Sequence, residues 1–358
     1  MESRSKIAEA RSGQSRLGSE SRVSIFEFRV SRSVKKASLA ILGLVLLAVL
    51  ATWIVLLQVR IGPWRLGAFF ICLSLVLGLF VALTNPSFVK QLRTWAVGSL
   101  AAAVAMPLLL LVPYFVVAFG TRTFSWLGLA KLVAYILVPV LLLLPHRFHR
   151  ADRVGWRDFA AMLALAFPVA AGWLKGIWRW PEDLYAFRPV YSVLVGVYAF
   201  VVIRNLEGVG YRLIPRKGDL LDGLANLLGF SVLGIPLGLA LNFIHFRAEG
   251  VSILSFMAQF VGIYLTIAIP EELLFRGVLQ NFLVKSFRGP RQGVYGVAIA
   301  SVIFGLSHLH HAPVPNWRYA ILATLAGLFY GNAYRTRQRL CASALTHALV
   351  DTMWHFWF

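Results

Sequence analysis

Long apolar runs separated by short polar segments dominate the pattern of the chain. Most runs have about 18 or more residues, enough for an α-helix to cross a hydrocarbon core of roughly 30 Å. The pattern predicts eleven membrane-spanning helices: 37–57, 66–84, 95–118, 126–144, 157–174, 189–203, 222–244, 251–287, 294–311, 317–334 and 340–358. We therefore expect an all-α, polytopic transmembrane bundle, because a helix satisfies its backbone hydrogen bonds without water.

Composition agrees with this pattern. The 358 residues are 59% hydrophobic and only 14% charged, and the mean hydropathy is +0.73. These values exclude an ordinary soluble globular domain. The two cysteines, Cys72 and Cys341, lie far apart in or beside apolar runs, so they form neither a CxxC metal site nor a redox motif.

The net charge of +20 is informative through its distribution. Residues 1–36 carry nine Lys or Arg against four Glu, which predicts a disordered basic tail that favours anionic lipid; no nucleic-acid motif accompanies it. With this tail inside, the inner loops carry sixteen Lys or Arg and the outer loops eight. This asymmetry predicts a cytoplasmic N-terminus, and we expect a multi-pass protein of a bacterial plasma membrane.

Ionisable groups enter the apolar runs only after residue 250, apart from Lys131. An ionised side chain at the bilayer centre costs at least ~2.5 kcal/mol, so a cluster of such groups indicates a functional site. The acidic and histidine residues that lie well within these runs are Glu271, Glu272, His308, His347, Asp351 and His355.

Helical spacing pairs some of these residues. Glu272 and Arg276 are four apart, so they share a helix face and are expected to pair. Glu271 is rotated by about 100° around the helix from Glu272, so its carboxylate is free for a role other than pairing with Arg276. His347 and Asp351 are also four apart.

The depth of these residues in the membrane tests whether they are able to meet. Counted from the polar loop 288–293 at ~1.5 Å per residue, Glu271 and His308 lie at similar heights, so they are able to meet. The same arithmetic puts His347 only about 10 Å above Leu340. The last helix must therefore begin before Leu340, tilt, or enter the membrane more deeply.

Three motifs carry a resemblance to a known family. EELLFRG at 271–277, FGLSH at 304–308 and HALVD at 347–351 resemble the EExxxR, FxxxH and Hxxx(N or D) motifs of the CPBP intramembrane endopeptidases. That family includes CAAX prenyl proteases and bacteriocin-processing or immunity proteins. The resemblance covers roughly residues 250–355, so the role of the preceding helices remains unknown.

The resemblance implies roles for six residues. Glu271 and His308 would activate a water molecule, and Glu272 with Arg276 would hold the glutamate helix in position. His347 and the residue at 351 would stabilise the oxyanion. Asp351 stands where other members have Asn, and an ionised carboxylate only accepts hydrogen bonds, so Asp351 is expected to fix the tautomer of His347 or to be protonated.

A metal site is the alternative to this chemistry. Glu271, His308 and His347 are suitable Zn²⁺ ligands, and a catalytic zinc needs three ligands plus water. The chain has no HExxH motif, so we favour metal-free catalysis and expect no cofactor.

The sequence thus predicts three regions: a tail over 1–36, about six membrane helices of unknown role over 37–221, and a catalytic membrane domain over 222–358. The predicted function is hydrolysis of a peptide bond in a hydrophobic or lipid-anchored substrate within the membrane. A proton-coupled transporter and a non-catalytic immunity-type protein are the alternatives, since buried carboxylates and histidines also build proton relays.

Overall fold

The computed structural model describes residues 62–148, 153–179, 187–247 and 250–358. Over these ranges all regular structure is helical, which confirms the all-α fold class. The predicted tail and the predicted helix 37–57 lie outside the described residues. Residues 62–358 form one compact unit by their contacts.

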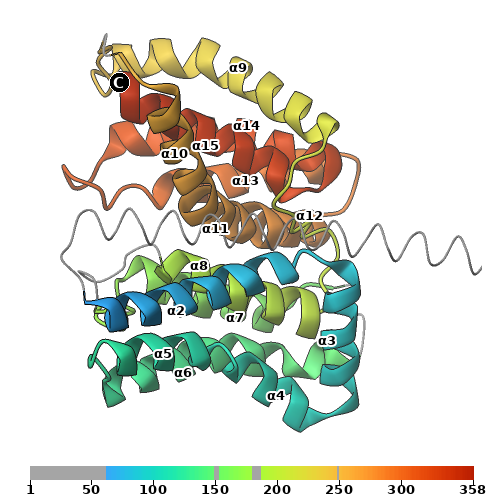
Figure 1. Cartoon of the computed structure of the whole chain (residues 1–358). Helices are drawn as coiled ribbons and strands as arrows, with labels where there is room; N and C mark the ends of the chain where they lie inside the picture. The colour runs from blue at the N-terminus through green and yellow to red at the C-terminus, as the bar shows by residue number, and fades with distance from the viewer. Residues whose placement is uncertain (1–61, 149–152, 180–186, 248–249) are drawn as a thin grey trace, which may run out of the picture. The chain divides into compact units, whose positions relative to one another are not determined.

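The first group of helices precedes residue 204 (Figure 1). It comprises α2 (Pro63–Ala82), α3 (Pro86–Gly98), α4 (Leu100–Leu108), α5 (Leu111–Gly120), α6 (Trp126–Leu143) with η1 (Leu144–Arg147), α7 (Trp156–Ala170), and α8 (Phe187–Gly196) with η2 (Val197–Ile203).

The second group carries the candidate site. It begins with α9 (Lys217–Ala240) and continues with one helix made of α10 (Ile253–Ile263), η3 (Tyr264–Ala268), α11 (Ile269–Glu272), η4 (Leu273–Gln280) and α12 (Asn281–Ser286). The last helices are α13 (Gln292–Leu306), α14 (Trp317–Arg337) and α15 (Leu340–Trp357).

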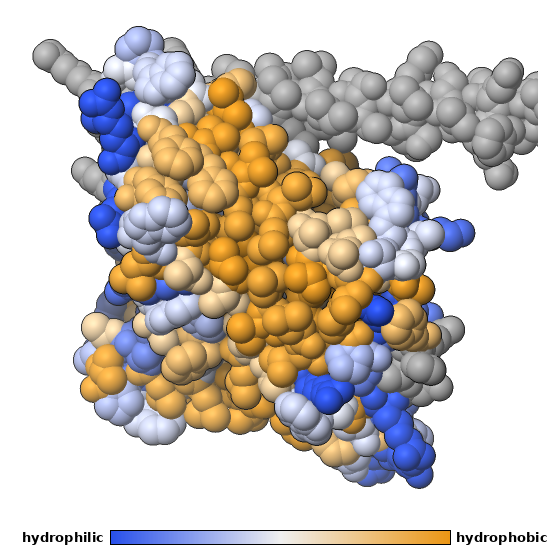
Figure 2. Space-filling view, turned by 90° about the horizontal axis from the view of Figure 1, so that it is seen from below, coloured by the Kyte–Doolittle hydropathy of each residue, from blue (hydrophilic) through white to orange (hydrophobic). Residues whose placement is uncertain are grey.

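Five helices in the described ranges are long and apolar enough to cross a membrane: Pro63–Ala82, Leu100–Gly120, Trp126–Arg147, Lys217–Ala240 and Ile253–Ser286. Figure 2 shows a broad apolar surface over the first group of helices, with charged residues gathered at its edges. Exposed apolar surface of this extent suits contact with lipid. The chain is an integral membrane protein.

The predicted span 95–118 is wrong at its start. Helix α3 ends at Gly98, and Ser99 is extended, with φ −146° and ψ 129°. The Ser99 hydroxyl accepts from the Ala102 N–H, so it caps a new helix. Hydropathy averages over such a break because a single serine changes the apolar character of the window very little.

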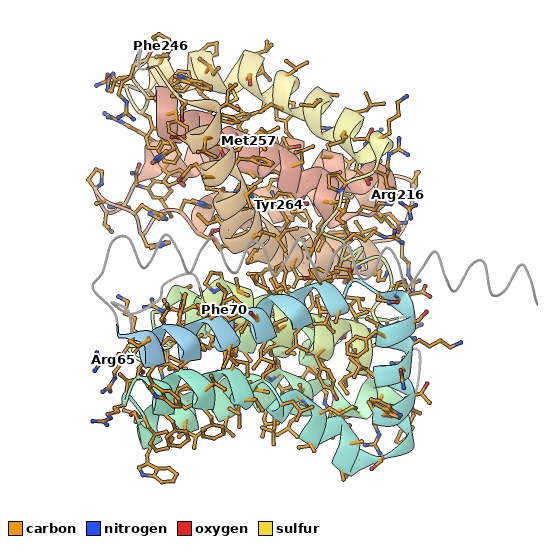
Figure 3. All side chains as sticks on the ribbon, in the orientation of Figure 1. Arg65, Phe70, Arg216, Phe246, Met257 and Tyr264 are labelled. Carbon is orange, nitrogen blue, oxygen red and sulfur yellow. The ribbon has the colours of Figure 1, made fainter. Side chains whose placement is uncertain are left out.

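The last helix begins at Leu340, as predicted, but it begins inside the protein. Leu340 and Cys341 are both fully buried, and the Leu340 N–H donates to the Gly210 carbonyl at 3.1 Å. The segment after η2 therefore covers this helix start. The Tyr264 hydroxyl donates to the Leu213 carbonyl at 2.8 Å and ties the same segment to η3 (Figure 3).

Helix α8 joins the two groups. It packs against α2, α6 and α7 on one side and against α11, η3 and η4 on the other. Leu165 of α7 and Leu273 of η4 both lie against Gly196 at the end of α8, where a Cβ would clash with their side chains. The helices of unknown role thus contact the glutamate-bearing helix directly.

Candidate active site

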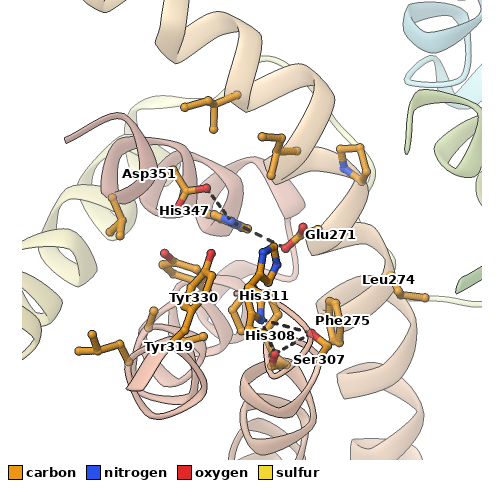
Figure 4. Close-up of a pocket in the computed structure, with 18 of the residues that line it drawn as sticks. Glu271, Leu274, Phe275, Ser307, His308, His311, Tyr319, Tyr330, His347 and Asp351 are labelled. Carbon is orange, nitrogen blue, oxygen red and sulfur yellow. Dashed lines mark hydrogen bonds and ion pairs between the residues drawn. The ribbon is translucent and has the colours of Figure 1, made fainter. Parts of the chain in front are cut away.

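The two glutamates lie in α11, a short α-helical segment between the π-helical stretches η3 and η4. π-Helical turns use i→i+5 hydrogen bonds and often occur at functional sites. Figure 4 shows Glu271 on this helix facing His347 and the histidines that follow α13.

Both carboxylate oxygens of Glu272 have hydrogen-bond partners. It is 0% exposed, and its Oε1 accepts from Arg276 Nη1 at 2.9 Å, which confirms the predicted pair. The same Oε1 lies 2.8 Å from His347 Nδ1, and Oε2 accepts from the Ser343 hydroxyl. The contacts with His347 and Ser343 were not predicted from the sequence.

Arg276 is buried between this carboxylate and an aromatic layer. Its guanidinium lies 4.5 Å from the ring centroid of Phe304 and 5.3 Å from that of Tyr330. Its Nη2 donates to the Gly327 carbonyl of α14 at 3.2 Å. Ionic, aromatic and backbone contacts therefore all fix this side chain.

His347 lies between three carboxylates. Its Nδ1 faces Glu272. Its Nε2 is 3.4 Å from Asp351 Oδ2 and 3.9 Å from Glu271 Oε2 (Figure 4). Tyr330 stacks on the imidazole at 4.7 Å between ring centroids, with the planes inclined by 15°. The ring plane and both ring nitrogens of His347 are thus constrained.

Glu271 differs from its neighbour. Its Oε2 is buried and accepts no hydrogen bond within the part of the chain that the structure describes. The distance of 3.9 Å to His347 Nε2 exceeds that of a direct hydrogen bond. Because buried carboxylate oxygens are normally paired, this oxygen is available to an incoming group.

The prediction that His308 lies on a helix is wrong. Helix α13 ends at Leu306, and His308 occupies the turn that follows. Its Nδ1 lies 2.8 Å from the Phe304 carbonyl oxygen, which only accepts, so Nδ1 donates and Nε2 of the neutral ring keeps its lone pair. Tyr319 packs edge-on against the ring at 4.6 Å.

One cavity of about 1060 Å³ brings the predicted catalytic residues together. Glu271, His308, His347 and Asp351 all line it, whereas Glu272 and Arg276 do not. Most of the remaining lining is apolar. The arrangement provides an available carboxylate, an imidazole acceptor and a fixed imidazole donor at one side of a hydrophobic space.

The donor geometry of the site bears on the zinc alternative. Across the described ranges, no three His, Cys, Asp or Glu side chains are placed to hold a metal ion. One nitrogen of His347 is engaged by Glu272, and the other lies between two carboxylates. Metal dependence stays a prediction, to be settled by experiment.

Two residues of the site carry no recognisable signal in the sequence. Tyr330 lies among several aromatic residues of α14, and Ser343 is one of several small residues at the start of α15. Phe304 is 2% exposed and contacts the rings of both His308 and His347.

A comparison with known protein families finds a match over the region that holds this site. Residues 253–353 match the family described as type II CAAX prenyl endopeptidase Rce1-like, and the match runs from the start of α10 into α15. No significant match to a curated protein or to a solved structure is found. The family match confirms the resemblance carried by the three motifs. Over residues 253–353, which hold the candidate site, this integral membrane protein is therefore similar to the type II CAAX prenyl endopeptidases of the Rce1-like family.

Proposed function

We propose that this peptidase hydrolyses a peptide bond in a lipid-anchored or strongly apolar substrate, using water activated by Glu271 and His308. The observation that carries this proposal is the contrast between two adjacent glutamates. Glu272 accepts from Arg276, His347 and Ser343, whereas Glu271 Oε2 has no donor among the described residues and lines the cavity.

The first step is proton transfer from water. A water molecule in the cavity donates one hydrogen bond to Glu271 and the other to His308 Nε2, which is the acceptor of the tautomer fixed by Phe304. Glu271 takes the proton, and the remaining hydroxide attacks the carbonyl carbon of the scissile peptide bond. General-base catalysis of this kind contributes typically ~10²–10⁴-fold in rate.

The second step needs a donor for the oxyanion. With both nitrogens protonated, His347 donates through Nδ1 to Glu272 and presents Nε2–H beside Asp351 and Glu271. The oxyanion then accepts from Nε2–H. When the carbon–nitrogen bond breaks, the proton held by Glu271 passes to the leaving amine, and a carboxylic acid and an amine result; the acid then gives its proton to the amine or to solvent.

In this scheme Asp351 supports His347 and does not contact the oxyanion directly. Its Oδ2 is 3.4 Å from His347 Nε2, so it orients the ring while Glu272 holds the other nitrogen. The substitution of Asp for the Asn of other family members is compatible with this indirect role.

Substitution of His308 tests the proposal. We expect His308→Ala to lower kcat about 10²-fold on a farnesylated peptide, because the water loses its second acceptor. The measurement is product formation by purified protein in lipid nanodiscs. His245→Ala is the control, since His245 is exposed and does not line the cavity. A His308→Ala variant as active as the wild type would overturn the proposed role.

Metal removal separates the two possible chemistries. If Glu271 acts as a base, chelation followed by desalting should leave the hydrolysis rate unchanged, and elemental analysis should find no stoichiometric metal. One zinc per chain, with activity lost on chelation and restored by Zn²⁺, would instead make Glu271, His308 and His347 ligands.

A further inference from the structure

Part of the cavity wall comes from a helix outside the residues that match the family. Helix α7 lines the cavity along its C-terminal half, from Met162 to Ala170, whereas the match begins at residue 253. No role follows from the family resemblance for this helix. Its position suggests a role in substrate choice.

Contacts with neighbouring segments of the protein fix the position of helix α7. The Tyr135 hydroxyl of α6 donates to the Leu165 carbonyl at 3.2 Å, and Ala161 is fully buried. At the start of the helix, Asp158 forms a buried ion pair with Arg204 at 2.5 Å. A wall anchored in this way keeps its distance from the glutamate helix when a substrate binds.

The wall reaches the catalytic side of the cavity. Met162 packs against the buried cluster that contains Phe275, Phe304 and Tyr330. Phe304 contacts the His308 ring at 4.7 Å between centroids, and Tyr330 stacks on His347. One aromatic layer therefore separates α7 from two of the proposed catalytic residues.

The cavity face of α7 is entirely apolar, because residues 159–170 contain no charged or hydrogen-bonding side chain. Leu163 and Phe167 both line the cavity and are 58% and 68% exposed, so they form a rim that faces outward. Leu227 and Phe230 of α9 also line the cavity, and both are apolar. An apolar rim admits a chain dissolved in lipid without desolvating polar groups.

We propose that α7 binds the lipid chain of the substrate and that Ala166 sets the chain length the cavity accepts. This inference rests on the proposed function and assigns the lipid chain of that substrate to a helix outside the residues that match the family. The volume of about 1060 Å³ lies at the upper limit of ordinary ligand pockets, so it accommodates both a peptide and a chain. Ala166 is the small side chain in the middle of the lining stretch of α7, where a larger residue would shorten the available space.

A matched pair of alanines tests the inference. Ala166 lines the cavity and Ala164, two positions earlier on the same helix, does not. We expect Ala166→Phe to lower kcat/KM for a farnesylated peptide by about ten-fold or more, because a hydrophobic site discriminates about ten-fold or more per methylene. The same variant should leave a geranylated peptide nearly unaffected. Ala164→Phe should change neither substrate.

Equal losses for both chain lengths, or no loss for either, would overturn the proposed role of Ala166. Thermal unfolding of each variant shows whether it is folded. A second readout uses no α7 variant: a farnesylated peptide with a photoreactive group on its chain should label residues 162–170, and excess unlabelled farnesylated peptide should suppress the labelling. Labelling that the competitor does not suppress would indicate bulk lipid contact only and would contradict the inference.

The labelling experiment also separates this inference from the proposed function. It is carried out with the Glu271→Gln variant, so it requires binding and not hydrolysis. Competed labelling of α7 together with an inactive wild-type protein would refute the peptidase proposal and leave lipid-chain binding intact. Hydrolysis that depends on Glu271, without labelling of α7, would refute only the inference.

Discussion

Replacing Glu271 by glutamine should abolish hydrolysis while the protein stays folded. The amide keeps the shape of the side chain but does not accept the proton of the attacking water, so we expect kcat to fall by at least ~10³-fold. Glu271 Oε2 accepts no hydrogen bond from the described residues, and the substitution therefore breaks no hydrogen bond seen there. The measurement is cleavage of a farnesylated peptide by purified protein in nanodiscs.

Thermal unfolding provides the control for this variant. Its midpoint should equal that of the wild type, which would assign the loss to chemistry and not to misfolding. A Glu271→Gln variant that keeps the wild-type kcat would show that another group takes the proton from water.

The same substitution at the adjacent position should act in a different way. Glu272 accepts from Arg276, His347 and Ser343, and it is fully buried. In Glu272→Gln the charge that balances a buried guanidinium is lost, and breaking a buried ion pair costs roughly 3–5 kcal/mol. We expect a clearly lower thermal midpoint and also lost activity, because His347 loses the acceptor that orients it.

The two variants are matched controls for each other because they change the same side chain at consecutive positions. Loss of activity should be common to both, whereas loss of stability should be confined to Glu272→Gln. If the two thermal midpoints are equal, Glu272 does not support the site in the manner inferred from its contacts.

Local geometry explains which features of the site were predictable. The Glu272–Arg276 pair follows from i,i+4 spacing on one helix, so the sequence alone was sufficient. The contact between Glu272 and His347 joins residues 75 apart. It depends on how two helices are rotated against each other, and hydropathy carries no information on that rotation. The functional roles of Glu271, His308, His347 and Asp351 stay predictions.

Helix ends were less predictable than helix existence. Ser99 interrupts a predicted span through a single cap, and α13 ends two residues before His308. Both events depend on one or two polar groups within apolar surroundings. The contribution of α7 to the cavity was also missed, because no motif in the first half of the chain distinguishes a cavity wall from a lipid-facing helix.

The helix that carries the two glutamates combines α-helical and π-helical turns, and its length sets the direction of their side chains. Each π-type turn closes one residue later than an α-helical turn. A π-type turn therefore takes up one extra residue with little net rotation. Deleting one residue from the α-helical turns of α10 would instead rotate Glu271 and Glu272 by about 100° relative to the start of that helix. The carboxylate now directed at the cavity would then face a packed neighbour. Insertions and deletions in this helix should therefore be tolerated far less than substitutions, even where every side chain is conserved.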